Sequence, residues 1–245
     1  MKKLVLVAAI LGAFVATGAN AAEVTVAVAA NFYKPLQSLA SAYEKTHSDT
    51  VKLSVGSTGK LYAQIVNGAP FDIFLAADQR RPQKLMKDKQ AVAGSEFTYA
   101  KGRLIFWSKE ANLIQGDAYL KKGAFDKLAI ANPKAAPYGA ASIETMKNLK
   151  VYASLKDKIV FGQNIGQTYS YVSYGNVKQG FVALSQVYRD GKLTSGSGWI
   201  VPGNLYHSIR QDAVLLKDNA PAKAFLNYLQ TPEAQAIIRS YGYDI

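Results

Sequence analysis

The chain has 245 residues, no cysteine and a formal net charge of +12 at pH 7. Without cysteine there are no disulfide bonds, thiolate nucleophiles, cysteine metal sites or lipid anchors attached through a cysteine. The lysines are scattered and form no stripe with interleaved aromatic residues, which argues against nucleic acid as a partner. The positive charge suits an anionic solute or acidic lipid, although a solvated basic surface explains most of the lysines.

The first residues predict a cleavable secretory signal. Lys2-Lys3 precedes an apolar run over residues 4–15, which is too short for a permanent membrane anchor. Ala19-Asn20-Ala21 then supplies small residues at the two positions that a signal peptidase reads. We therefore expect residues 1–21 to be removed and the mature protein to be free in the periplasm.

Hydrophobic periodicity predicts alternating strands and helices along the mature chain. In its first half we expect strands over residues 24–29, 50–55 and 71–76, and helices over residues 35–45, 61–67 and 81–89. In its second half we expect strands over residues 98–107, with a break at Lys101-Gly102, and over residues 127–131, 159–162, 180–184 and 212–216. We expect helices over residues 140–149, 164–174, 222–229 and 232–241. This order is typical of parallel sheets covered by helices.

The length of the mature chain, about 224 residues, is enough for two small domains. Because no low-complexity linker separates them, we expect two lobes joined by strands that cross between them. The candidate crossings are Lys101-Gly102 and the stretch before Gln211-Asp212. The sequence thus predicts an α/β protein in which residues 22–100 plus 212–245 form lobe I and residues 101–211 form lobe II.

Four strand-to-helix junctions carry hydrogen-bond donors and no formal charge: Ala30-Asn31, Ser57-Thr58, Pro137-Tyr138 and Asn164-Ile165. The carboxyl ends of strands face the ligand crevice in open α/β sheets, and the first N–H groups of a helix lack partners. Together the junctions would hold a small, fully ionised oxyanion with fixed dipoles. Taken singly, Asn31, Ser57 or Thr58 is most simply explained as a helix N-cap, and Tyr138 is equally well explained as a core or turn residue.

Several segments, in order, resemble the periplasmic molybdate-binding proteins of ABC transporters (ModA type). They cover nearly the whole mature chain and comprise Val24–Asn31, Gly56–Leu61 with Gln64-Ile65, Gly68–Phe74 with Ala76–Asp78, Asn132-Pro133 with Pro137–Gly139, Gly180–Ser185, Phe225-Leu226 and Tyr241-Gly242. The resemblance implies a two-lobed solute-binding protein of type II, with a mixed or mostly parallel sheet flanked by helices in each lobe. It implies recognition of molybdate or tungstate without catalysis or a cofactor, and delivery to an inner-membrane ABC permease. We expect a monomer.

By that resemblance, the oxyanion contacts fall on Asn31, Ser57, Thr58, Tyr138 and the backbone N–H of Ile165. These groups would contact the molybdate oxygens, and none would ligate the metal directly. Asn31 stands where many members have serine, and Ala183 stands where many have a tyrosine that donates to the anion. The Asn31 amide and Tyr138 are the expected substitutes for the missing donors. The two departures leave the choice among molybdate, tungstate and chromate open.

Three other kinds of site lack the partner residues that their chemistry needs. Ser57 and Lys60 match the S-x-x-K pattern of serine acyl-transfer enzymes, but the S-D-N and K-T-G partners are absent. Leu61 follows Gly59-Lys60 where a phosphate loop needs serine or threonine for Mg²⁺. His47 and His207 are the two histidines, and neither belongs to a ligand cluster in the sequence.

A binding protein for chromate, sulfate, phosphate or an organic anion is a closer alternative, because it could use the same fold. A carboxylate ligand normally pairs with an arginine in the cleft, and none falls in the four junctions. A phosphate site often uses an acid to accept the proton of the phosphate, and the junctions carry no acid. The pattern therefore favours a fully deprotonated tetrahedral dianion.

Overall fold

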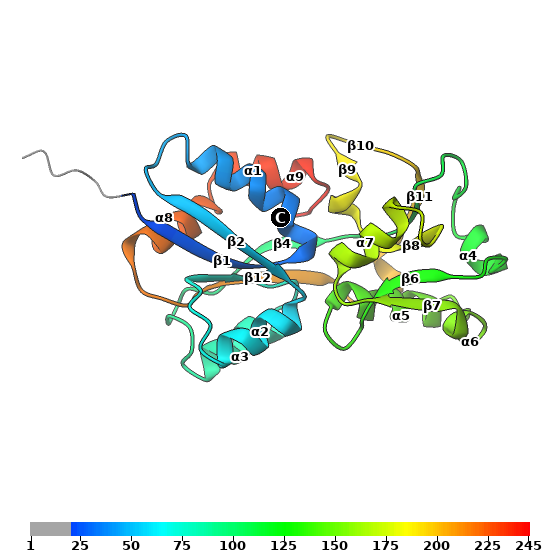
Figure 1. Ribbon diagram of the computed structural model, residues 1–245, viewed down its shortest axis with the longest axis horizontal. Coiled ribbons are helices and arrows are strands. Elements are labelled where there is room, and N and C mark those ends of the chain that lie inside the picture. Colours follow the sequence, from blue (N-terminus) through cyan, green and yellow to red (C-terminus); the bar gives the residue numbers. More distant parts are fainter. Residues whose placement is uncertain (1–20) are drawn as a thin grey trace, which may run out of the picture.

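The computed structural model describes residues 21–245. The predicted signal, residues 1–21, lies outside this range except for its last residue. The described chain forms two lobes, each built on a five-stranded sheet, that lie side by side along the long axis of the molecule (Figure 1). Among residues 21–245 no helix is both long and apolar enough to cross a membrane.

Lobe I contains a mixed sheet with the strand order β2-β1-β3-β12-β4. β1 pairs in parallel with β2 and β3, whereas β12 runs antiparallel to β3 and β4. The strands are β1 (Glu23–Ala29), β2 (Thr50–Gly56), β3 (Ile73–Leu75), β4 (Phe97–Gly102) and β12 (Ile209–Leu215). The helices are the short η1 (Ala30–Phe32), α1 (Tyr33–Tyr43), α2 (Thr58–Val66), α3 (Arg80–Lys87), α8 (Ala220–Tyr228) and α9 (Pro232–Ser240).

Lobe II contains a second mixed sheet with the order β11-β5-β8-β6-β7. Its strands are β5 (Leu104–Ser108), β6 (Leu128–Ala131), β7 (Ile159–Gly162), β8 (Gln179–Ala183) and β11 (Ser197–Ile200). Its helices are α4 (Ala118–Lys122), α5 (Pro137–Asn148), α6 (Tyr152–Leu155) and α7 (Ile165–Ser173), with the short η2 (Lys156–Lys158), η3 (Leu184–Gln186) and η4 (Gly203–Leu205). A small hairpin joins β9 (Tyr188–Arg189) to β10 (Lys192–Leu193).

Alternation along β1 explains how helices cover both faces of the lobe I sheet. Val24, Val26 and Val28 point to one face, where they pack in a cluster with residues of α1, α8 and α9. Ala27 points to the other face and joins a cluster with Leu61 of α2 and residues of α3. Figure 1 shows the two groups of helices on opposite sides of this sheet. Burial of both faces leaves the ends of the strands as the place for a ligand.

The expected α/β class is confirmed, and the differences lie mainly at the ends of elements. Helix α2 begins at Thr58 rather than 61, and α5 begins at Pro137 rather than 140. The strand over residues 98–107, with its expected break at Lys101-Gly102, is two strands that are interrupted one residue later, at Arg103. The expectation of mixed sheets is confirmed, because β1 and β6 have parallel neighbours whereas β12 and β5 run antiparallel to theirs. Strands β9, β10 and β11 and the short helices α4 and α6 were not predicted.

The chain crosses between the lobes along β4 and β12. These strands pair antiparallel, with Gly102 opposite Ile209, and β4 leads through Arg103 directly into β5 of lobe II. The register shifts between Gln211 and Asp212, so β12 carries an irregularity next to the crossing. The predicted lobe boundaries, 100/101 and 211/212, fall inside these two strands.

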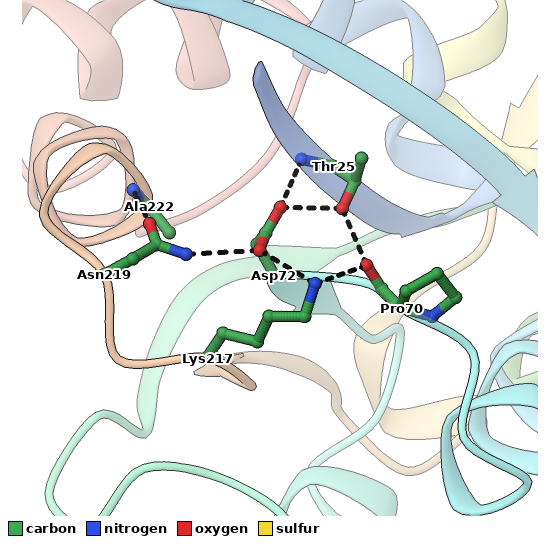
Figure 2. A network of polar contacts seen from close by, with 6 residues as sticks. All are labelled: Thr25, Pro70, Asp72, Lys217, Asn219 and Ala222. Atoms are coloured by element: carbon green, nitrogen blue, oxygen red, sulfur yellow. Dashed lines mark hydrogen bonds and ion pairs between the residues drawn. The ribbon is translucent and has the colours of Figure 1, made fainter. Parts of the chain in front are cut away.

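A buried carboxylate joins three segments at the far end of lobe I (Figure 2). Asp72 accepts hydrogen bonds from the backbone N–H and the hydroxyl of Thr25, each at 2.7 Å, and from Asn219 at 3.2 Å. Lys217 lies 3.3 Å away as an ion-pair partner. Burial alone would raise the pKa of Asp72, but the hydrogen bonds and Lys217 outweigh it and lower that pKa. Its stabilising contribution is therefore present above the unfolded-state pKa and lost as the pH falls through the folded-state pKa.

Candidate functional site

The four predicted junctions meet between the lobes around one small cavity. Each follows the carboxyl end of a strand: β1 and β2 in lobe I, and β6 and β7 in lobe II. The cavity is narrow, and none of its lining residues carries a formal charge. The lining residues are Ala29, Ala30, Asn31, Gly56, Ser57, Thr58, Ala77, Ala136, Pro137, Tyr138, Asn164 and Ile165.

The start of α2 leaves one backbone donor at the cavity. Ser57 has extended backbone angles, and its hydroxyl accepts the N–H of Lys60 at 3.3 Å, so Ser57 is an N-cap. The N–H of Gly59 donates to Ala135 O of lobe II at 3.0 Å. The N–H of Thr58, the first helical residue, is the remaining donor of this turn.

The two helices of lobe II begin in the same way. Asn164 caps α7 by accepting the N–H of Gln167 at 2.9 Å, which leaves the N–H of Ile165 at the first helical position. In α5 the first residue, Pro137, has no N–H, so the first donor is Tyr138. The helix starts close against β6, where a Cβ on Gly139 would lie 2.1 Å from Ala131 O. The Pro-Tyr-Gly sequence therefore suits a tightly packed helix start.

Thr58 adds a hydroxyl donor to the backbone donors. The residue is 1% exposed, and its Oγ1 accepts the N–H of Ala77 at 3.1 Å. Since Ala77 uses the oxygen only as an acceptor, the hydroxyl proton of Thr58 remains available for another acceptor. Backbone dipoles and this hydroxyl form an uncharged set of donors, which is suited to an oxyanion.

Asn31 takes part in a buried polar network rather than in a cap. Its Nδ2 donates to Gln211 Oε1 at 2.7 Å and to Tyr243 Oη at 2.9 Å. Its backbone carbonyl accepts the hydroxyl of Ser185 at 2.8 Å. No side-chain cap of η1 or α1 is present in the described chain, so the N-cap interpretation is wrong for Asn31.

Tyr138 lines the cavity at the helix start, while its phenol reaches into the same network. The side chain is almost fully buried, and its Oη accepts from Gln211 Nε2 at 3.2 Å. A Cβ on Gly102 would lie 2.1 Å from this oxygen, so β4 can pass here only with glycine. Burial raises the pKa of Tyr138 well above its usual value and raises the pKa of Tyr243 to about 12. Both phenols are therefore neutral hydrogen-bonding groups at neutral pH.

The lobes touch each other around the cavity. Besides the bond between Gly59 and Ala135, Ser185 of lobe II bonds to Asn31, and Arg81 Nη2 donates to Lys134 O at 3.4 Å. Small apolar residues of lobe I pack in one cluster with Ile165 and the buried Ala183 of lobe II. A ligand in the cavity would therefore be enclosed from both sides.

A larger groove lies beside the cavity and is rich in basic residues. Its lining includes the basic residues Arg80, Arg81, Lys134 and Arg210 and the acidic residues Asp78 and Glu144. Arg81 is paired with Asp78, which leaves Arg80, Lys134 and Arg210 as the cations without such a pair among the ion pairs of residues 21–245. We call the groove lined by Arg80, Lys134 and Arg210 the basic groove. Its field would attract anions toward the interface of the lobes.

The side chains considered for acyl transfer, for a phosphate loop and for metal binding are not arranged for these functions. Ser57 serves as a cap, and the Lys60 side chain is exposed. His47 stacks on Tyr43 with ring centroids 3.8 Å apart, whereas His207 pairs with Glu144. Within residues 21–245 no group of three histidine or acidic side chains gathers as a metal site.

Three residues of the site region were missed by sequence reasoning. Gln211, Tyr243 and Tyr99 join the network behind the cavity, and the first two lie 180 and 212 residues from Asn31 in the chain. Their residue types carry no motif, and only the crossing of β12 brings Gln211 to this place. No local signal in the sequence could have identified them.

Comparison with known proteins gives one consistent family. The family model described as bacterial extracellular solute-binding protein matches residues 24–244. The molybdate-binding protein ModA of Azotobacter vinelandii is 52% identical over 244 residues, covering 98% of this chain and 97% of that protein. The protein of the same name from Rhodobacter capsulatus is 47% identical, covering 92% of this chain and 89% of that protein.

Solved structures agree with this similarity. The periplasmic molybdate-binding protein of Azotobacter vinelandii superposes with a TM-score of 0.87 at 38% identity, covering 91% of this chain and 99% of that one. The sulfate-binding protein SubI of Mycobacterium tuberculosis has a TM-score of 0.70 at 11% identity, covering 91% of this chain and 86% of that one. At that identity SubI shares the fold alone.

Proposed function

Because this chain belongs to the family of bacterial extracellular solute-binding proteins, we propose that it binds molybdate or tungstate in the cavity between its lobes. The protein would act in the periplasm, as the secretory pattern of residues 1–21 suggests. It would present the anion to an ABC permease in the inner membrane. No bond is made or broken in this function, and no cofactor takes part.

The observation that carries the proposal is the uncharged cavity formed by four helix starts. A dianion loses its water shell on entering, and many fixed donors must replace that shell. The N–H groups of Asn31, Thr58, Tyr138 and Ile165 and the Thr58 hydroxyl would supply donors from several directions. Relatives of high identity named as molybdate-binding proteins support molybdate as the ligand.

The same lining supports discrimination against phosphate. Phosphate carries a proton near neutral pH and is best held where a carboxylate accepts that proton. No carboxylate belongs to the cavity lining. Sulfate has no such proton, so size is the basis on which molybdate would be preferred over sulfate: the smaller tetrahedron would reach fewer donors at hydrogen-bond distance.

Enclosure from both sides suggests how binding and transport would be linked. A ligand gains contacts from both lobes only when they are closed, so it shifts the population toward the closed form. The crossing strands β4 and β12 would be the hinge. The closed form would then be the one that a permease recognises.

A competition titration tests this proposal. Calorimetry on residues 22–245 should give one binding site for molybdate or tungstate, with sulfate and phosphate displacing molybdate only at much higher concentrations. Chromate is titrated in the same way to rank it against these anions. The expected order follows from the size of the tetrahedron and from the absence of an acid in the lining. Equal affinity for sulfate and molybdate would contradict the proposed selectivity, and no binding of any of the five anions would overturn the function.

A further inference from the structure

A cluster of buried polar side chains lies behind the cavity. The function proposed above uses backbone N–H groups of this region but not these side chains. We call Asn31, Gln211, Tyr243, Tyr138 and Tyr99 the hinge network, because it brings together β4, β12 and the helix starts. Every member is buried, with exposure between 0% and 4%. In such surroundings each missing hydrogen bond is costly, so the donors and acceptors must balance.

In the arrangement seen in the structure, one buried oxygen has no hydrogen-bond donor and one hydroxyl proton is shared by two acceptors. Asn31 Oδ1 is buried and has no hydrogen-bond partner in the described chain, although Asn31 lines the cavity. Tyr99 Oη lies 2.8 Å from Ala76 O and 3.0 Å from Gln211 Oε1, so one proton faces two acceptors. Moreover, an oxyanion offers only acceptors, and it would be repelled by the Asn31 carbonyl oxygen.

Turning the amides of Asn31 and Gln211 by 180° together relieves Tyr99 and gives Asn31 Oδ1 partners. It leaves the Asn31 NH₂ group as the one that needs an acceptor, which an anion in the cavity would supply. Gln211 Nε2 then donates to Asn31 Oδ1 and to Tyr99 Oη, which leaves the Tyr99 proton for the backbone carbonyl of Ala76. In the structure Tyr243 Oη lies 3.0 Å from both Asn31 O and Ser185 Oγ. In the turned arrangement its proton goes to Asn31 Oδ1, while Asn31 O keeps the hydrogen bond from Ser185. Tyr138 donates to Gln211 Oε1. Amide nitrogen and oxygen exchange places without moving other atoms, so the hydrogen-bond network determines which arrangement is stable.

The two amides can turn only as a pair. Their facing atoms, Asn31 Nδ2 and Gln211 Oε1, are 2.7 Å apart. Turning Asn31 alone would place two carbonyl oxygens at that distance, and turning Gln211 alone would place two NH₂ groups there. Gln211 therefore decides which end of the Asn31 amide is available to the cavity.

We propose that Gln211 is a positioning residue for the anion site, and that the anion is bound with both amides turned so that the Asn31 NH₂ group donates to it. This inference rests on the proposed function. The neutral phenols of Tyr138 and Tyr243 each hold one proton, and the turned arrangement commits both protons to the amides. Tyr138 would then serve the anion through its backbone N–H and not through its hydroxyl.

The arrangement also affects selectivity. An Asn31 NH₂ group at the cavity suits a fully ionised oxyanion, whereas an Asn31 carbonyl oxygen suits an oxyanion that carries a proton. Gln211 would thus favour molybdate over hydrogen phosphate without touching either anion.

The first test compares two buried glutamines. Gln211→Met keeps the length of the side chain but removes its donors and acceptor, so the affinity for molybdate should fall about tenfold. Gln179→Met is the matched control, because Gln179 is 1% exposed but lies in β8 and donates to Lys127 O. Both variants should lose thermal stability, and only Gln211→Met should lose affinity. Equal affinity in Gln211→Met and the unsubstituted protein would overturn the inference.

The second test observes the amides directly by NMR of the ¹⁵N-labelled protein saturated with molybdate. In the turned arrangement the Gln211 NH₂ protons lie near the Tyr99 ring, and the Asn31 NH₂ protons lie away from the Tyr243 ring. Close contacts of Gln211 NH₂ with the Tyr138 ring, and of Asn31 NH₂ with the Tyr243 ring, in the saturated protein would overturn the inference. The proposed function would then stand, because saturation itself is measured separately. Failure to saturate would overturn both.

Discussion

Replacing Thr58 by valine is expected to lower the affinity for molybdate by about 10- to 100-fold. Valine has nearly the same shape but has no hydroxyl, so one oxygen of a charged ligand loses its donor in a desolvated cavity. A hydrogen bond to a charged group contributes about 1.5–3 kcal/mol, which corresponds to this change in affinity. Calorimetric titration of the variant with molybdate measures the effect.

A control is needed because Thr58 also supports the fold. Its oxygen accepts the buried N–H of Ala77, and valine leaves that group without a partner. Thr58→Ser keeps the hydroxyl and removes only a methyl group, so its affinity should stay within a few-fold of the unsubstituted protein. Thermal unfolding of both variants separates lost stability from lost binding. If the folded valine variant binds molybdate as tightly as the serine variant, the hydroxyl is no part of the site.

Replacing Ile165 by proline should lower the affinity by a similar factor, about 10- to 100-fold, by deleting a single backbone donor. Proline is favoured at the first helical position, which Ile165 occupies in α7. The preceding residue, Asn164, has φ −149° and ψ 173°, angles that a residue before proline adopts readily. The helix start should therefore survive while its N–H is lost, and molybdate titration measures the result.

The control for this change is Ile165→Val. Ile165 is buried at 3% exposure, so any smaller side chain costs packing energy. Valine, like proline, has three side-chain carbons in place of the four of isoleucine, but it keeps the N–H. The proline variant should bind much more weakly than the valine variant. Similar affinities of the two would show that the Ile165 N–H does not face the anion.

The junctions around the cavity could be predicted from the sequence because their signals are local. At Ser57-Thr58 an alternating strand ends, a polar pair follows, and a helical pattern begins within a few residues. In an open sheet the carboxyl ends of the strands face the ligand, and such a junction lies at one of these ends. The structure places Asn31, Thr58, Tyr138 and Ile165 around one cavity, as the four separate junctions predicted. Their contacts with an anion remain predictions.

Helix starts were predicted less accurately than helix existence. Periodicity begins with the first buried apolar residue, Leu61 in α2, whereas the helix itself begins after its cap at Ser57. In α5 the periodicity predicts a start at residue 140, but Pro137 occupies the first helical position. The error matters here, because the residues between cap and first apolar contact are the ones that carry the donors.

The hinge network could not be predicted, because its contacts depend on the whole fold. Asn31 and Tyr243 come from opposite ends of the chain, and Gln211 reaches them from a crossing strand. Glutamine, asparagine and tyrosine occur at many buried positions, so their residue types alone do not identify a network. The three-dimensional positions, and the balance of donors and acceptors that they impose, appear only in the folded structure.

The central claim, that the oxyanion is held between the lobes by Thr58 and the helix starts, is tested most directly by a crystal structure of the molybdate complex. Anomalous scattering at the molybdenum edge locates the metal without reference to the protein model. The account predicts one strong peak in the cavity between Thr58, Tyr138 and Ile165. A peak in the basic groove near Arg80 and Lys134, with none in the cavity, would contradict it.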